Sequence, residues 1–152
     1  MRKLVLLIFI LSMKLSYSQE CKLSFAQLSS LANYSLSEFD NFALKNGFSL
    51  NTHDQTYFCD SEAHNGHHNL LSRQDTATFL LIIYSIYDKK DYLIFKEILE
   101  KGEFIGEQNE KGILRFKYSY TGKIIILQVG TAPDNSNTYM ISLAAINNRR
   151  QP

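Results

Sequence analysis

Two long segments of the chain repeat apolar residues every three or four positions, which is the spacing of one face of an α-helix. In the first segment the apolar stripe consists of Leu36, Phe39, Phe42 and Ala43. In the second segment it consists of Tyr92, Phe95, Ile98 and Leu99. The first segment begins with the capping box Ser35-Leu36-Ser37-Glu38, and the second starts near Asp88 and stops at Gly102. A shorter apolar stripe follows Ser24, so the pattern predicts three helices.

Other segments alternate apolar and polar residues or form short apolar runs, as β-strands do. The predicted strands cover residues 48–50, 56–59, 78–87, 113–120, 124–129 and 138–146. Leu70 and Leu71 are the candidates for a further short strand. Helices and strands are therefore expected together in one α+β domain.

The two halves of the chain share an order of elements and a constant spacing between matching residues. Phe39, Ala43, Phe48 and Tyr57 correspond to Phe95, Leu99, Phe104 and Ile113, each pair 56 positions apart. This spacing favours a duplication, with pseudo-repeats at about 24–87 and 88–147, over two unrelated helix-then-strand segments. Two tandem α-β-β-β units would pair their strands into one antiparallel sheet with the helices on one face.

The dipeptide Thr121-Gly122 lies between two alternating segments and predicts a two-residue hairpin loop, which fixes the register of both strands. One side of this hairpin is almost entirely apolar and is expected to pack against the helices. The other side carries Arg115, Lys117, Ile124, Ile126 and Gln128. Because helices on one face leave the other face open, these five residues are the predicted partner-binding surface. The partner would be an unidentified protein, a small ligand or a second copy of the chain.

The chain opens with Met1-Arg2-Lys3 and an unbroken apolar run over residues 4–11. A short basic start before an apolar core of about 7–15 residues is typical of a secretory signal peptide. Small residues at Ser16 and Ser18 predict cleavage before Gln19. We therefore expect a signal peptide over 1–18, a single domain over 19–147 and a flexible tail over 148–152. The protein is expected to be exported, periplasmic or secreted, with no transmembrane segment after cleavage.

Cleavage of the predicted signal peptide would also change the charge of the protein. The full chain has 16 Lys and Arg against 15 Asp and Glu, a net charge of +1. Loss of Arg2, Lys3 and Lys14 leaves 16 − 3 = 13 against 15, a net charge of −2 with neutral histidines. A weakly acidic domain has no general attraction to phosphate backbones, so no nucleic acid is expected as a partner.

Two cysteines, Cys21 and Cys59, remain after the predicted cleavage, and an oxidising compartment would allow them to form a disulfide. Cys59 also begins a segment rich in side chains that bind zinc or copper. The candidate metal ligands are Cys59, Asp60, His64, His67 and His68. The two hypotheses compete, because a disulfide-bonded Cys59 cannot be a thiolate ligand. The spacing of these residues matches no established metal motif.

Residues 36–48 combine a Phe-x-x-aromatic pattern with Lys-x-Gly-aromatic at a predicted helix-to-strand junction. This pattern comes after the predicted export signal, and it resembles that of small uncharacterised exported proteins of Gram-negative bacteria. In architecture only, the order of helices and strands resembles the tandem repeats of secreted β-lactamase-inhibitor-like modules. These resemblances imply an exported α+β module, and they transfer no catalytic residue because a fold does not fix a function.

The sequence contains none of the common catalytic motifs. There is no Gly-x-Ser-x-Gly, Gly-x-Gly-x-x-Gly, phosphate-binding loop or His-Glu-x-x-His. We therefore expect a non-catalytic binding or protein-interaction module without a cofactor. The first alternative is a metal-binding protein that uses the histidine-rich loop 59–68. The second is an enzyme in which His64 or His68 acts as a general base beside Asp60.

Overall fold

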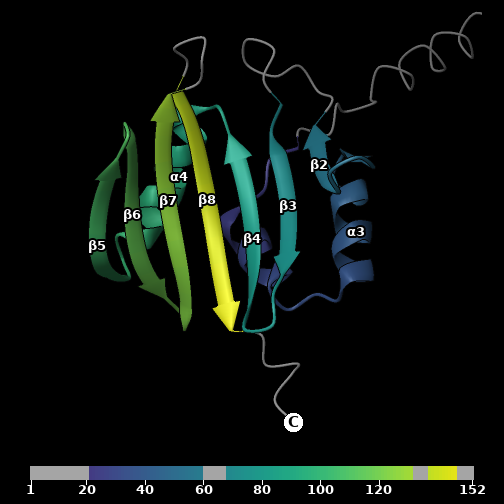
Figure 1. Ribbon diagram of the computed structural model, residues 1–152, viewed down its shortest axis with the longest axis horizontal. Helices are drawn as coiled ribbons and strands as arrows, with labels where there is room; N and C mark the ends of the chain where they lie inside the picture. Colours follow the sequence, from purple (N-terminus) through teal and green to yellow (C-terminus); the bar gives the residue numbers. More distant parts are fainter. Residues whose placement is uncertain (1–20, 60–67, 132–136, 147–152) are drawn as a thin grey trace, which may run out of the picture.

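The computed structural model describes residues 21–59, 68–131 and 137–146, so the predicted signal peptide and the predicted tail lie outside the described residues. These ranges contain three helices and eight strands (Figure 1). The helices are α2 (Phe25–Leu31), α3 (Leu36–Lys45) and α4 (Lys89–Leu99). The strands of the first half are β1 (Phe48–Asn51), β2 (Thr56–Cys59), β3 (Leu70–Asp75) and β4 (Phe79–Ile86). Those of the second half are β5 (Glu103–Glu110), β6 (Ile113–Tyr120), β7 (Lys123–Thr131) and β8 (Asn137–Ile146).

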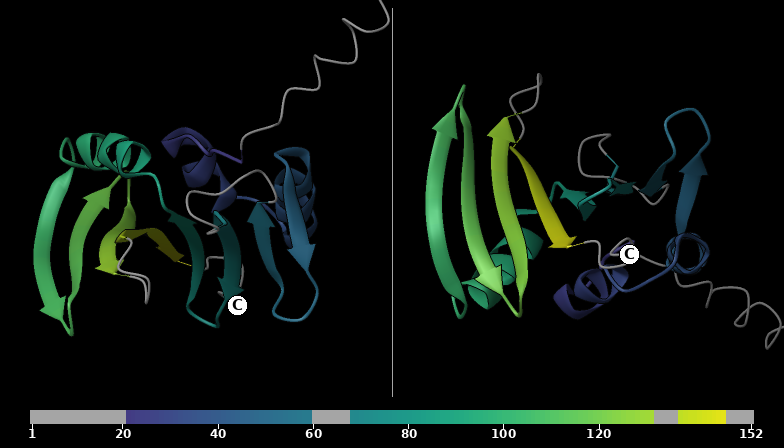
Figure 2. Two further views of the ribbon diagram at one scale, coloured as in Figure 1. Left: turned by 90° about the horizontal axis from the view of Figure 1, so that it is seen from above. Right: turned by 60° about the horizontal axis from the view of Figure 1, so that its bottom comes forward.

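All eight strands form a single twisted antiparallel sheet, in the order β1-β2-β3-β4-β8-β7-β6-β5. The three helices lie on the same side of this sheet, so the molecule has two layers (Figure 2). At the centre β4 pairs with β8, and this ladder joins the strands of the first half to those of the second. The predicted α+β class with one antiparallel sheet is therefore confirmed.

Each helix begins where the sequence predicts. Ser24 and Ser35 form capping boxes with Gln27 and Glu38, in which each serine hydroxyl accepts a backbone N–H and the partner side chain accepts the serine N–H. Asp88 caps α4 through its side chain. These contacts satisfy N–H groups that lack a partner inside the helix. Among the helices in the described ranges, none is both long and apolar enough to cross a lipid bilayer.

Helix α3 buries a narrower stripe than its sequence predicts. Phe39 and Ala43 are buried, whereas Leu36 is 60% exposed. The helix packs beside β1 and β2, which are only four residues long. Leu36 is the first residue of α3, and its side chain lies past the core. The prediction that Leu36 lies on the buried stripe is wrong.

The core lies between the helices and the sheet, and polar contacts close it at the β1–β3 end. The Tyr57 hydroxyl donates to Asp40 at 2.7 Å and so joins β2 to α3. Burial, together with this carboxylate, raises the pKa of Tyr57 to about 12. Arg73 donates to the carbonyl oxygen of Tyr34 at 2.7 Å, and its guanidinium lies 5.9 Å from the centre of the Phe39 ring. These contacts hold the segment between α2 and α3 against the sheet.

The segment before α2 is fastened to the sheet at two points. Cys21 and Cys59 form a disulfide with their Cα atoms 5.8 Å apart, which confirms the predicted bridge. The buried Tyr84 hydroxyl donates to the Cys21 carbonyl oxygen at 3.0 Å and accepts the Leu23 N–H at 3.2 Å. Burial raises the pKa of Tyr84 to about 12. The beginning of the described chain is thereby held against β2 and β4.

The hairpin loop Thr121-Gly122 forms as predicted. Both residues have positive φ, 48° and 75°, as a type I′ turn requires. The residue pairs between β6 and β7 are those predicted from this loop, from Tyr120 opposite Lys123 to Leu114 opposite Val129. A second turn of the same kind, Lys111-Gly112, joins β5 to β6 with φ of 50° and 78°.

Each half of the sheet has four strands, whereas the sequence pattern predicts three in each unit. Strand β5 was missed because its eight residues, EFIGEQNE, are mostly polar and lie at the edge of the sheet. An edge strand that is exposed on both faces lacks the alternation that identifies a half-buried strand. Strand β3 extends beyond Leu70 and Leu71 because polar residues up to Asp75 complete the pairing with β4.

Reducing the disulfide is expected to lower the free energy of unfolding by about 3–4 kcal/mol, because the bridge closes a loop of 38 residues in the loop-entropy account. Urea unfolding with and without dithiothreitol measures this difference. A double Cys21→Ala and Cys59→Ala variant should show the same loss and no response to the reductant. Equal unfolding midpoints for oxidised and reduced wild type would contradict the prediction.

Substituting Gly102 is expected to destabilise the fold because no room exists for a side chain. An added Cβ would lie 2.8 Å from the Ser119 carbonyl oxygen and 2.9 Å from the Tyr120 ring. Gly102→Ala should therefore cost about 1–3 kcal/mol in unfolding free energy. Gly106→Ala is the matched control, since an added Cβ there meets nothing within 4 Å, and it should stay within about 0.5 kcal/mol of wild type. Similar losses for both variants would show that packing at Gly102 is not the cause.

Candidate functional site

The side of the sheet turned away from the helices, hereafter the open face, is defined by the strand register. Its central row, from β5 to β3, is Gly106, Lys117, Ile126, Ser142, Ile83 and Ser72. The row on one side is Gln108, Arg115, Gln128, Met140, Ser85 and Leu70. The row on the other side is Glu103, Ser119, Ile124, Ala144, Leu81 and Gln74. Within the described ranges, no helix packs on this face (Figure 2).

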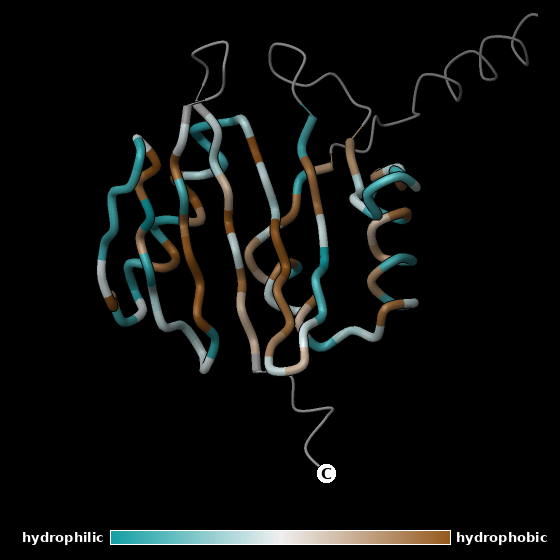
Figure 3. The backbone as a smooth tube through the Cα atoms, in the orientation of Figure 1, coloured by the Kyte–Doolittle hydropathy of each residue, from teal (hydrophilic) through white to brown (hydrophobic). Residues whose placement is uncertain are grey.

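Apolar side chains of the open face gather on its central strands. Ile124 and Ile126 of β7 lie near Leu81 and Ile83 of β4, and all four are half-buried among their neighbours. Between them, Ser142 of β8 is only 8% exposed. Figure 3 shows hydrophobic residues along β4 and β7, whereas the edge strand β5 is mostly hydrophilic. An apolar centre beside a polar rim is the arrangement found in protein–protein interfaces.

Two cations lie toward the β5 edge of this apolar centre. Arg115 is engaged within the protein, because its Nε donates to Gln128 Oε1 at 2.9 Å and its guanidinium lies 3.5 Å from the Glu110 carboxylate. Lys117 is exposed, and it forms no ion pair with any residue that the structure describes. Lys117 is therefore the cation of this face that is available to a partner.

A β-bulge next to Lys117 hollows the open face. The pairing of β5 with β6 shifts between Phe104 and Gly106, so Ile105 is an extra residue and is 45% exposed. Gly106 then lies opposite Lys117 and has no side chain to fill the surface. The result is a cavity of about 240 Å³, whose lining includes Ile105, Gly106, Arg115, Lys117 and Ile126.

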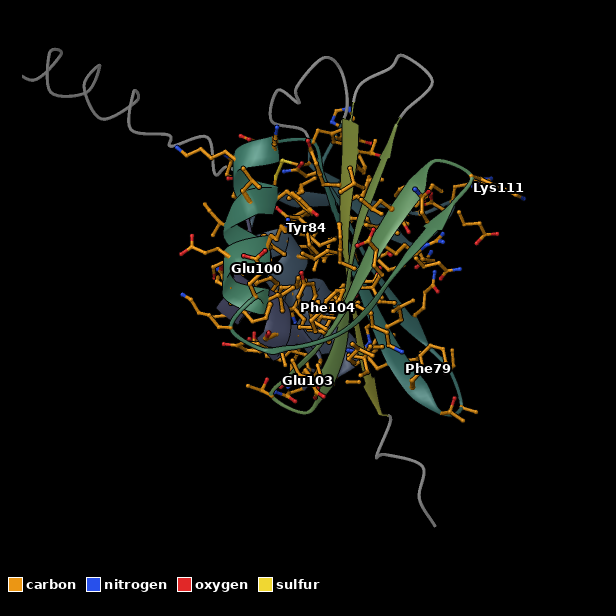
Figure 4. All side chains as sticks on the ribbon, turned by 90° about the vertical axis from the view of Figure 1, so that its left-hand side faces the viewer. Phe79, Tyr84, Glu100, Glu103, Phe104 and Lys111 are labelled. Carbon is orange, nitrogen blue, oxygen red and sulfur yellow. A yellow bond between two sulfur atoms is a disulfide. The ribbon has the colours of Figure 1, made fainter. Side chains whose placement is uncertain are left out.

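Exposed aromatic residues do not form a second patch among the described residues. Figure 4 looks onto the β5 edge and shows Phe104 toward the helices and Phe79 on the opposite side of the sheet. Phe104 contacts the Tyr118 ring with centres 5.5 Å apart. Phe79 lies at the end of β4, in the alternation that places Leu81 and Ile83 on the open face. Of these two exposed rings, Phe79 therefore adds to the apolar surface of the open face and Phe104 does not.

The structure brings the five predicted partner-binding residues together on the open face. Arg115 lies opposite Gln128, Lys117 opposite Ile126, and Ile124 follows in the neighbouring row. Sequence reasoning missed the contribution of β4 and β8, because a run that is apolar on both faces gives no signal for which face a residue occupies. It also missed the cavity, for which an isolated glycine in a polar segment is the only hint.

The metal alternative loses one of its ligands. Cys59 is disulfide-bonded, so it offers no thiolate to a metal. Asp60, His64 and His67 lie outside the described residues, and His68 Nδ1 is hydrogen-bonded to the Cys59 carbonyl oxygen. In the part of the chain that the structure describes, no three His, Cys, Asp or Glu side chains are placed to hold one metal ion.

Comparisons of the chain with protein-family models, with curated proteins and with solved structures gave no match.

The ion pair of Arg115 with Glu110 is expected to contribute little to stability, because both side chains are partly exposed to water. Glu110→Gln should change the free energy of unfolding by less than about 0.5 kcal/mol, measured by urea denaturation. A loss above about 1 kcal/mol would contradict this expectation. It would show that the ion pair stabilises the fold, so that substitutions of Arg115 or Glu110 would alter stability as well as binding.

Proposed function

We propose that this protein is an exported, non-catalytic protein-interaction module that binds its partner with the open face of the sheet. The observation that carries the proposal is the cluster of aliphatic side chains at the centre of a face that no described helix covers. Apolar surface left in water is normally small on a monomer, and a partner would remove it from water. The exposed Lys117 at the rim adds a charge that would orient the partner.

The export part of the proposal rests on the basic and apolar start of the sequence. The disulfide between Cys21 and Cys59 supports it, because disulfides persist in oxidising compartments such as the periplasm or the extracellular space. The non-catalytic part rests on the chemistry of the open face. An arginine that is already paired and an exposed lysine supply positive charge, whereas acid–base catalysis needs a donor and an acceptor held together in a concave site.

We also propose that the two halves are tandem repeats, now with four strands each. The strand order β1-β2-β3-β4-β8-β7-β6-β5 is that of two equivalent halves meeting at their last strands, which supports the proposal. The offset of 56 residues carries Leu71 of β3 onto Leu127 of β7, and both are fully buried. The offset of 56 residues does not match the fourth strands, β4 and β8, without a shift of one residue. Tyr84 of β4 faces the core, whereas Met140 of β8, 56 residues later, lies on the open face. Joining two such halves side by side makes the open face wider than either half could provide.

Replacing Ile124 and Ile126 together with threonine is expected to abolish partner binding and to preserve the fold. Threonine keeps the β-branched shape that suits a strand, so the stability loss should be about 1 kcal/mol per site. Immobilised wild type and variant are compared in capture from the envelope and secreted fractions of the producing cells. The wild type should retain a defined partner, or a second copy of itself in light scattering, that the variant does not retain.

The matched control is Leu36→Gln with Leu44→Gln, which removes two exposed leucines from α3 on the helix side of the molecule. It should bind as wild type does. Equal capture by the open-face variant and by the control would contradict the proposal. So would a wild type that is strictly monomeric and retains nothing.

A further inference from the structure

The bulge in β5 makes a recess of limited size beside the available cation. Its volume of about 240 Å³ lies below the roughly 300–1,000 Å³ of sites that enclose a whole small-molecule ligand. A recess of this size in an otherwise broad face is suited to one protruding side chain of a larger partner. Gly106 creates the space, because a Cβ at this position would meet nothing within 4 Å.

The charges around the recess select for a negative group. Lys117 lines it, is exposed and has no ion-pair partner among the described residues. Arg115 also lines it, but shares its guanidinium with Gln128 and Glu110. Glu107 belongs to the lining as well. It pairs with Phe116, so the alternation of the strand directs its side chain toward the helix side.

The recess is also bordered by apolar groups. Ile105 is 45% exposed on one side, and Ile126 is half-buried on the other. From Lys117 the central row continues through Ile126 and Ser142 to Ile83. Adjacent strands are about 4.8 Å apart, so Ile83 lies three strand spacings, or about 14 Å, from Lys117. An extended chain rises about 3.4 Å per residue, so four residues cover nearly the same distance.

We infer that the recess receives the carboxylate of an aspartate or glutamate side chain from the partner protein, on a segment whose neighbouring side chains are aliphatic. This inference rests on the proposed function and specifies the chemistry of the partner. The carboxylate bonds to the Lys117 ammonium at the Gly106 bulge. In an extended segment that crosses the strands, the side chain two residues away lies about 7 Å along the row, between Ile126 and Ser142, and the side chain four residues away lies over Ile83. The recognised pattern is an acidic residue with apolar residues at the second and fourth positions from it.

The test uses the purified, disulfide-bonded protein and a phage-displayed library of random twelve-residue peptides as the probe. Enriched peptides are synthesised, and their affinities for wild type and variants are measured by fluorescence polarisation. Gly106→Val fills the recess without strain, since an added Cβ there meets nothing within 4 Å and the φ of Gly106 is not positive. Lys117→Gln removes the charge and keeps an unbranched polar side chain that is one atom shorter. Urea unfolding of each variant confirms that it is folded.

If the inference holds, the enriched peptides share the acidic and apolar pattern, and both variants weaken their binding at least about tenfold, the loss expected for one charge-assisted contact. Replacing the acidic residue of the peptide by its amide should have a similar effect. Lys89→Gln, which removes an exposed lysine at the start of α4, is the matched control and should leave binding unchanged.

Two results would overturn the inference, and they differ in what they say of the proposed function. One result is a set of enriched peptides that lose binding to the Ile124→Thr, Ile126→Thr variant but contain no acidic residue, or that bind the Gly106→Val and Lys117→Gln variants as tightly as wild type. This result would remove the carboxylate site and leave the open face as a binding surface. The other result is that no enriched peptide depends on Ile126 for its binding, which would also remove the carboxylate site. The partner capture described above would then decide the proposed function independently.

Discussion

The pairing of β4 with β8 is the contact on which the rest of the architecture depends. It joins eight residue pairs, from Phe79 with Ile146 to Ile86 with Tyr139, and it is the ladder that unites the two halves of the sheet. Alternate residues of β4 and β8 supply both the centre of the core, through Tyr84 and Ile141, and the centre of the open face. Without this ladder there would be two separate four-stranded sheets, and neither the core nor the open face would be continuous.

Much of the fold could be predicted because local signals agreed with the tertiary structure. The caps at Ser35 and Asp88 fixed the helix starts, and Thr121-Gly122 fixed a register that settled which face each residue of β6 and β7 occupies. Where a signal failed, the reason is tertiary. Leu36 has helical spacing but is the first residue of α3 and is 60% exposed, and β5 is stabilised by pairing with β6 rather than by an apolar pattern.

The candidate site was predictable to the extent that it follows from register. A two-residue loop with both residues at positive φ leaves a single pairing, so Arg115, Lys117 and Ile126 had to share a face. The cavity does not follow from register. It depends on the extra residue Ile105, and a bulge is decided by the geometry of the whole edge. Ile83 belongs to the open-face cluster because β4 lies next to β8, and no local sequence pattern specifies that pairing.

The position of β8 has a consequence for how the protein acquires its structure. The strand that occupies the middle of the sheet is the last one along the described chain, so the central ladder cannot form until almost the whole domain has emerged during synthesis. Until then β4 presents an unpaired and strongly apolar edge, which is the kind of edge that recruits strands from other chains. Contacts of such long sequence separation also form slowly. A folding chain of this topology therefore exposes an aggregation-prone strand edge until its last strand is in place.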